Sequence, residues 1–174
     1  MYIPRSVYSE LVCESMGILM FPGIRFFEPN DRFYSWMEAN YLKSTPIYDV
    51  GAGCGQVSAG LSKRGFKPIA LDIQLREDSE YPIALCNGAD FPYPNHAVVM
   101  LCRPCHGEFP YRVIQNAEES GVTAILYVGL DKNVESDLGS YCHYFQREYM
   151  KVGVDGESIW RWNLDEEHQK AFAA

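Results

Sequence analysis

Short apolar runs alternate with amphipathic runs from about residue 46 onward, and a Gly, Pro or Asp separates each run from the next. The apolar run at 46–50 is the first expected strand, and it leads into an expected helix at 56–64 that stops at Gly65. Further strands are expected at 67–72, 81–86, 97–102 and 122–130, with a second helix at 108–120. Strands that alternate with helices in this way predict an α/β fold built on a mostly parallel sheet.

The C-terminal part follows a different pattern. Residues 141–164 hold two aromatic-rich runs on either side of the turn sequence Val-Asp-Gly-Glu. Two such runs around a tight turn are typical of antiparallel strands that follow each other directly. We therefore expect a C-terminal antiparallel hairpin that closes one edge of the sheet.

The N-terminal part shows helical spacing in two pieces, 6–17 and 30–42, and Asn30 or Asp31 is placed to cap the second helix. These helices are expected to pack on the sheet as a cover. We therefore expect a single domain at 1–174 with three parts: a helical cover at 1–45, a core at 46–163 and an acidic tail at 164–174.

Composition and charge narrow the choice of partners. The chain has 174 residues, 47% of them hydrophobic and 14% aromatic, which is enough for the core of one domain. Fifteen Lys and Arg against twenty-three Asp and Glu give a formal net charge of −8, with no run of basic residues. This charge repels phosphate backbones and anionic membranes, which disfavours nucleic acid and membranes as partners. The six cysteines fall mostly in apolar runs and no targeting segment precedes them, so we expect a cytoplasmic protein with reduced thiols.

A glycine-rich turn joins the first strand to the first helix within 47–61. Glycines at such a turn let the backbone approach a ligand and present amide groups at the helix start. No Lys-Ser or Lys-Thr pair follows, which excludes a nucleoside triphosphate loop, and Gln56 stands where a dinucleotide turn needs its third glycine. The turn has instead an acidic residue followed by three glycines spaced two apart: Asp49, Gly51, Gly53 and Gly55.

This arrangement resembles the first motif of the class I S-adenosylmethionine-dependent methyltransferases. The resemblance implies a Rossmann-like fold and S-adenosylmethionine as the cofactor, with the glycines beneath its methionine part. Asp72 closes the second strand, twenty-one residues after Gly51, where the family's second motif places a carboxylate that accepts both ribose hydroxyls. At the adenine amino group the family places an acidic or amide residue, and Asp90 is the candidate here, with Asn87 second. Short connections at 73–80 and 87–97 leave no room for two of the family's usual crossover helices, so the chain resembles a minimal member.

The residues after the fourth strand should face the transferred methyl group, because ligands of open α/β sheets bind outside the carboxyl ends of the strands. These residues read Arg-Pro-Cys-His-Gly at 103–107. Enzymes of the family that methylate amino groups of nucleic acid bases have an Asp or Asn, two prolines and an aromatic residue at this position. Residues 103–107 lack this motif, which disfavours methylation of base amino groups. We expect Arg103 and His106 to meet the acceptor, with His106 as a general base; the alternative for His106 is a cap of the helix at 108–120.

Cys105 leaves several interpretations open. The Pro-Cys pair resembles the cytosine-5 methyltransferases, whose thiolate adds to a pyrimidine, and Arg103 and His106 would lower the pKa of such a thiol. A zinc site would use Cys102, Cys105 and His106, with Cys142-His143 as the second pair, but we assign no metal. The third interpretation is a small residue in a loop.

The sequence therefore predicts a methyltransferase that acts on a small molecule or a protein side chain, with His106, Arg103 and Cys105 as the catalytic candidates. The competing hypothesis is a non-catalytic relative that serves as an interaction module, with or without the cofactor. The shortened connections favour this second hypothesis. A glycine turn without any ligand is the remaining alternative, and the position of Gln56 disfavours a nicotinamide oxidoreductase.

Overall fold

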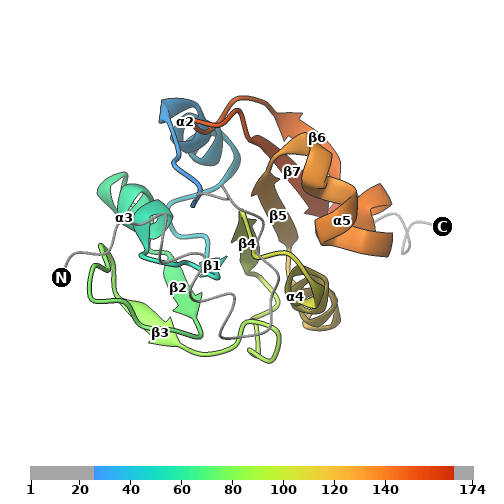
Figure 1. Ribbon diagram of the computed structural model, residues 1–174, viewed down its shortest axis with the longest axis horizontal. Coiled ribbons are helices and arrows are strands. Elements are labelled where there is room, and N and C mark those ends of the chain that lie inside the picture. Colours follow the sequence, from blue (N-terminus) through green and yellow to red (C-terminus); the bar gives the residue numbers. More distant parts are fainter. Residues whose placement is uncertain (1–25, 167–174) are drawn as a thin grey trace.

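The computed structural model describes residues 26–166, so the helix expected at 6–17 lies outside the described residues. Seven strands form one sheet in the order β3-β2-β1-β4-β5-β7-β6 (Figure 1). The strands are β1 Ile47–Val50, β2 Ile69–Asp72, β3 Ile83–Leu85, β4 Val98–Cys102, β5 Ala124–Gly129, β6 Gln146–Tyr149 and β7 Ser158–Asn163. Strands β1 to β5 pair in parallel, whereas β7 is antiparallel to both β5 and β6. The predicted α/β class, mostly parallel with a C-terminal antiparallel pair, is confirmed.

Helices cover both faces of the sheet. Helices α2 and α3 lie on one face, and α4 and α5 lie on the other (Figure 1). Their bounds are α2 Asp31–Asn40, α3 Gln56–Lys63, α4 Glu108–Glu119 and α5 Val134–Leu138, with 3-10 turns η1 Asp131–Asn133 and η2 Gly139–Tyr144. Side chains of β4 alternate between the two cores: Val98 and Met100 join the α2–α3 side, and Val99 and Leu101 join the α4–α5 side. The central strands are therefore buried on both faces, as a parallel sheet requires.

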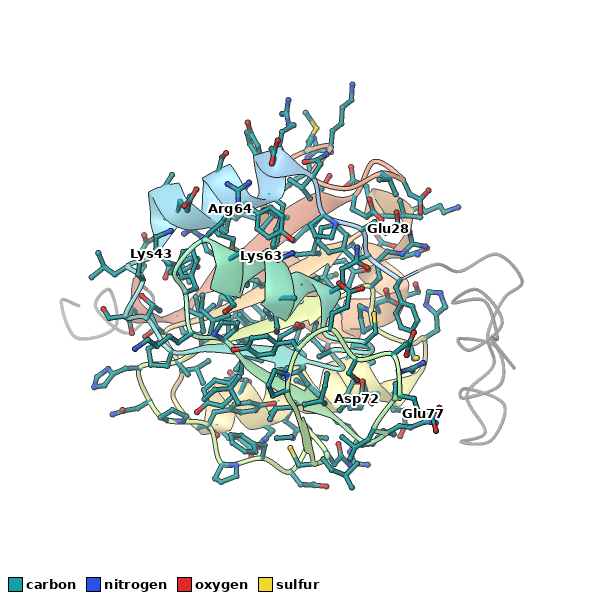
Figure 2. The ribbon with its side chains drawn as sticks, turned by 90° about the vertical axis from the view of Figure 1, so that its left-hand side faces the viewer. Glu28, Lys43, Lys63, Arg64, Asp72 and Glu77 are labelled. Carbon is teal, nitrogen blue, oxygen red and sulfur yellow. The ribbon has the colours of Figure 1, made fainter. Side chains whose placement is uncertain are left out.

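The cover helix α2 is fixed at its start and along its side. The Asn30 side chain accepts a hydrogen bond from the Arg32 N–H at 2.9 Å, which confirms Asn30 as the predicted cap. Arg64, at the end of α3, donates to Asp31 at 2.8 Å and to Glu38 at 3.3 Å, and Figure 2 shows it directly below α2. These contacts place α2 over α3, next to the glycine turn.

The C-terminal hairpin is confirmed as a pair, but its predicted bounds are wrong. The segment η1–α5–η2 occupies Asp131 to Tyr144, so β6 starts only at Gln146. Apolar residues in this segment are too few and too closely spaced for a strand or a long helix to be visible in the sequence. The connection between the two strands is also longer than a tight turn, because β6 ends at Tyr149 and β7 begins at Ser158.

The connections at 73–80 and 87–97 contain no helix, as predicted. They consist of turns and bends, several of them held by side chains. In one of them the Tyr93 hydroxyl donates to the Gly88 carbonyl at 2.7 Å. The carboxyl ends of β2 and β3 are therefore bordered by loops, and these loops form one wall of the candidate site.

Candidate functional site

The glycine turn between β1 and α3 needs glycine for its backbone. Gly51, Gly53 and Gly55 have φ angles of +70°, +61° and +76°, in the left-handed region that other residues adopt only at a cost. Gly55 is the N-cap of α3, and its N–H donates to the Ala52 carbonyl at 2.9 Å. The three spaced glycines thus shape a compact loop at the start of a helix.

Asp72 holds this turn in place. Its Oδ2 accepts the Gly53 N–H at 2.8 Å, and its Oδ1 accepts the Gln74 N–H at 3.0 Å. The residue is only 8% exposed, and Figure 2 shows it at the end of β2, on the same side of the molecule as Glu77. An ionised carboxylate offers about four acceptor sites, so two hydroxyls of a ligand can still bind. The two predicted residues Gly53 and Asp72 are therefore in direct contact.

A mainly apolar pocket opens where the carboxyl ends of β1, β2 and β4 meet. It is lined by Phe26, Gly51, Leu71, Asp72, Ile73, Arg76, Cys86, Gly88, Arg103, Pro104, Cys105 and Phe109. Four predicted site residues thus share one pocket: Gly51, Asp72, Arg103 and Cys105. The position agrees with the rule that ligands of open α/β sheets bind at the carboxyl ends of the strands.

Phe26 covers the turn and narrows this pocket. A Cβ atom added to Gly53 would lie 2.8 Å from Cε1 of Phe26, and the Arg76 guanidinium lies 5.0 Å from the centre of the Phe26 ring. The pocket encloses about 80 Å³, whereas sites for small ligands usually span about 300–1,000 Å³. Sequence reasoning missed Phe26 because it lies far from the turn in the chain and follows no recognisable pattern.

Asp49 is buried beneath the turn at the end of β1. Its Oδ2 accepts the Ser58 hydroxyl at 2.7 Å, and it borders a small cavity with Gly51 and Gln56. Burial raises the pKa of the Asp49 carboxyl to about 6; the Asp72 carboxylate adds to the rise, and the Ser58 hydrogen bond opposes it. A cationic ligand group at this carboxylate would favour the ionised form.

Replacing Asp49 by asparagine should stabilise the ligand-free protein, and the gain should depend on pH. The pKa of Asp49 is about 6 in the folded chain, above its unfolded value, so wild-type stability falls as pH rises from about 4 to 6. We expect Asp49→Asn to raise the unfolding free energy by about 2–3 kcal/mol at pH 8 and to leave it nearly unchanged at pH 4. Urea unfolding at both pH values measures this, with the exposed Asp90→Asn as the control. An equal gain at both pH values would contradict it.

The predicted adenine contact is placed less favourably than the other residues. Asp90 is exposed and is not among the residues that line the pocket. Asn87 is exposed too, and its Oδ1 accepts the Ala89 N–H at 3.0 Å within the turn. Gly88 is buried and lines the pocket instead. A contact from this loop would thus come from backbone at Gly88, and the spacing in the sequence could not show which of the four turn residues faces inward.

Arg103 has partners that the sequence did not indicate. Its backbone φ is +45°, and its Nη1 donates to Asp155 at 3.1 Å and to Glu157 at 3.0 Å. The Glu157 side chain is fully buried and that of Arg103 is 8% exposed. The guanidinium therefore fixes the β6–β7 connection to the end of β4, while the residue still borders the pocket.

His106 belongs to a chain of two hydrogen bonds, of which one is buried and one is partly buried. Its Nδ1 lies 2.6 Å from Oδ1 of Asp137 on α5, and Oδ2 of Asp137 accepts the Tyr127 hydroxyl at 2.6 Å. The helix α4 has Gly107 as its N-cap without a side-chain cap, so His106 does not cap this helix. Sequence reasoning missed Asp137 because α5 has only five residues and was not predicted.

The cysteines of the described residues show no arrangement for a metal. Within residues 26–166, no three His, Cys, Asp or Glu side chains lie close enough to hold a metal ion, and the five cysteines of this part are free. Burial raises the pKa of the Cys102 thiol well above its ordinary value. Cys105 borders the pocket, but Arg103 and His106, the two groups expected to activate it, are paired with carboxylates.

Solved structures share this fold at low sequence identity. The 23S rRNA methyltransferase ErmE matches with a TM-score of 0.57 and 12% identity, over 80% of this chain and 69% of that one. A 1,6-didemethyltoxoflavin-N1-methyltransferase of Burkholderia thailandensis, with bound S-adenosylhomocysteine, gives a TM-score of 0.55 and 10% identity over 76% of each chain. The chain has the fold of the class I S-adenosylmethionine-dependent methyltransferases. Magnesium protoporphyrin IX methyltransferase of Synechocystis PCC 6803, with bound S-adenosylmethionine, matches this methyltransferase fold with a TM-score of 0.52 and 13% identity, over 75% and 76% of the two chains.

Comparison of the sequence with family models and with curated proteins finds no significant match. The similarity to methyltransferases thus comes from the fold and from the turn at Gly51, Gly53 and Gly55. Between residues 26 and 166, no helix has the length and apolar character needed to cross a membrane.

Proposed function

We propose that this chain is an S-adenosylmethionine-dependent methyltransferase that acts on a small molecule or a protein side chain. One observation carries the proposal: Asp72 bonds directly to Gly53 of the glycine turn and borders the same pocket as the residues after β4. A turn for the cofactor and a loop for the acceptor are thus adjacent at the carboxyl edge of a parallel sheet.

The chemistry of the pocket suits this cofactor. Leu71, Ile73 and Phe109 offer an apolar wall for a flat base. Asp72 offers carboxylate oxygens for ribose hydroxyls, and the buried Asp49 offers a negative charge for an ammonium group. When bound, S-adenosylmethionine supplies a methyl group on a positively charged sulfur, and the protein must hold an acceptor in line with it.

The residues after β4 have separate roles in this proposal. His106 removes a proton from the acceptor, and Arg103 maintains the shape of the loop through its bonds to Asp155 and Glu157. Cys105 borders the acceptor without acting as a nucleophile, because the Arg103 and His106 side chains near it in sequence already pair with carboxylates. The net charge of −8 favours small or protein acceptors over nucleic acid.

Changes at His106 and Cys105 separate this mechanism from a cysteine nucleophile. His106→Ala should leave S-adenosylmethionine affinity nearly unchanged and lower turnover by about 10²–10⁴-fold. Cys105→Ser should have a mild effect, like the control Cys142→Ser outside the pocket. Transfer of a labelled methyl group to phenols, amines and lysine- or arginine-containing peptides measures turnover. Loss of activity in Cys105→Ser alone, with His106→Ala active, would support covalent catalysis instead.

The narrow pocket favours one competing function, a non-catalytic module with a methyltransferase fold. The Phe26 ring and Arg76 leave a volume of about 80 Å³, less than a nucleoside requires. On our proposal Phe26 moves when the cofactor binds, so Phe26→Ala should bind S-adenosylmethionine at least as tightly as the wild type. Equally absent binding in both proteins would support the non-catalytic module.

A further inference from the structure

The geometry points to Asp137 as a positioning residue that holds His106 with Nε2 as its basic nitrogen, which suits an acceptor whose nucleophilic atom carries a proton. This inference rests on the proposed methyltransferase function and deepens it. Its first support is the hydrogen-bond chain from Tyr127 on β5 through Asp137 on α5 to His106 after β4, in which both distances are 2.6 Å.

The direction of the hydrogen bonds follows from the chemistry of each group. Burial, together with the Asp137 carboxylate, raises the pKa of Tyr127 far above its ordinary value, so the phenol stays protonated and donates. An ionised carboxylate only accepts, and Asp137 therefore receives one bond on each oxygen. It follows that Nδ1 of His106 carries the proton in this network and Nε2 carries the lone pair.

Burial makes this orientation firm. The side chains of Asp137 and His106 are 2% and 19% exposed, so Asp137 cannot exchange its partners for water without opening the α4–α5 side of the core. A buried carboxylate needs such bonds, because leaving it unpaired costs several kcal/mol. The other charged groups that act on Tyr127 are Arg103 and Asp131. The histidine ring is thus fixed by two elements other than its own loop.

His106 belongs to the loop after β4 that borders the pocket, although its own side chain is not among those that line it. Pro104 and Cys105, just before it, and Phe109, just after it, all line the pocket where the proposed cofactor binds. The helix α5, which carries Asp137, packs beside α4, the helix that follows this loop (Figure 1). For this role the His106 ring, held by Asp137, must reach the acceptor from this loop.

The proton balance defines the class of acceptor. The nucleophilic oxygen or nitrogen bonds to the methyl carbon, and the carbon–sulfur bond breaks with its electron pair remaining on sulfur. The acceptor proton passes to Nε2 of His106, which becomes a cation stabilised by Asp137, and later leaves to water. Hydroxyl and amine acceptors need this step, whereas pyridines and thioethers do not.

Nuclear magnetic resonance of the ligand-free full chain tests the orientation directly. Nitrogen-15 shifts should show the Nδ1–H form for neutral His106, with the signal assigned by its loss in His106→Gln. Asp137→Asn should reduce the preference of neutral His106 for the Nδ1–H form, whereas the control Ser136→Ala, on the exposed side of α5, should keep this preference. Saturating S-adenosylhomocysteine should shift the Nε2 signal of His106. No such shift is expected if the His106–Asp137 pair has only a structural role. An Nε2–H form in the wild type, or an unchanged preference for Nδ1–H in Asp137→Asn, would overturn the inference.

Kinetics test the consequence for the acceptor. With phenols and anilines as acceptors, Asp137→Asn should lower kcat by about 10²-fold at a nearly unchanged KM, and Ser136→Ala should match the wild type. Methylation of pyridines or thioethers in preference to phenols and anilines would contradict the assignment. The resonance experiment first uses protein without ligand, so a negative result there refutes the role of Asp137 alone. Failure of the protein to bind S-adenosylmethionine refutes the proposed function instead.

Discussion

Asp72→Ala is expected to abolish S-adenosylmethionine binding and to destabilise the glycine turn. In the wild type the Asp72 carboxylate accepts the Gly53 N–H at 2.8 Å and the Gln74 N–H at 3.0 Å. The substitution leaves both N–H groups without this acceptor. Hydrogen bonds to a charged group contribute about 1.5–3 kcal/mol each. We expect the unfolding free energy to fall by roughly 2–4 kcal/mol and cofactor affinity to fall at least about 100-fold.

Asp78→Ala is the matched control, because it removes the same charge from an exposed position in the same connection. Its stability and affinity should stay close to those of the wild type. Asp72→Asn keeps one acceptor oxygen and should lie between the two. Urea unfolding and calorimetric titration measure both properties, and wild-type affinity in a folded Asp72→Ala protein would refute this role of Asp72.

Gly53→Val is expected to prevent cofactor binding for two separate reasons. The backbone φ of +61° strains any side chain, and the new Cβ would lie 2.8 Å from the Phe26 ring. The left-handed conformation alone costs about 1–2 kcal/mol. Cofactor affinity should fall below detection, because the branched side chain occupies the space where backbone and ligand must meet.

Two further variants separate these causes. Gly121→Val places the same side chain at φ +71° with no atom within 4 Å of the new Cβ, so it should lose only the stability that the left-handed backbone costs and bind the cofactor normally. Phe26→Ala added to Gly53→Val should recover stability without recovering binding. Normal binding by a folded Gly53→Val protein would mean that the turn has only a structural role.

Most of the fold could be predicted from the sequence, because the hydrophobic positions of the central helices and strands follow a regular period and turn residues mark their ends. The helix α3 ends before Gly65, whose φ is +91°, and α4 ends before Gly121, so the left-handed stop residues were visible in the sequence. The run at 122–130 predicted β5 because all six residues of that strand are buried. The short segment η1–α5–η2 was missed, since a five-residue helix shows no periodicity.

The candidate site could be predicted only where its residues are neighbours in the chain or follow a known spacing. Gly53 and Asp72 were both predicted as site residues, because one follows β1 and the other ends β2, two parallel strands that pair with each other. The hydrogen bond between them was not predicted. The pairing of His106 with Asp137, 31 residues apart, depends on how α5 packs, and no local pattern shows it. The same holds for Arg103 and the buried Glu157, which meet only when β7 pairs with β5.

Calorimetric titration of the full chain with S-adenosylhomocysteine and, in parallel, with NAD tests the central claim most directly. S-adenosylhomocysteine forms no product, so the heat reports binding alone. We predict saturable binding of S-adenosylhomocysteine at one site, loss of this binding in Asp72→Ala and no binding of NAD. Binding of NAD without S-adenosylhomocysteine, or an S-adenosylhomocysteine affinity that Asp72→Ala leaves unchanged, would contradict the assignment of this site.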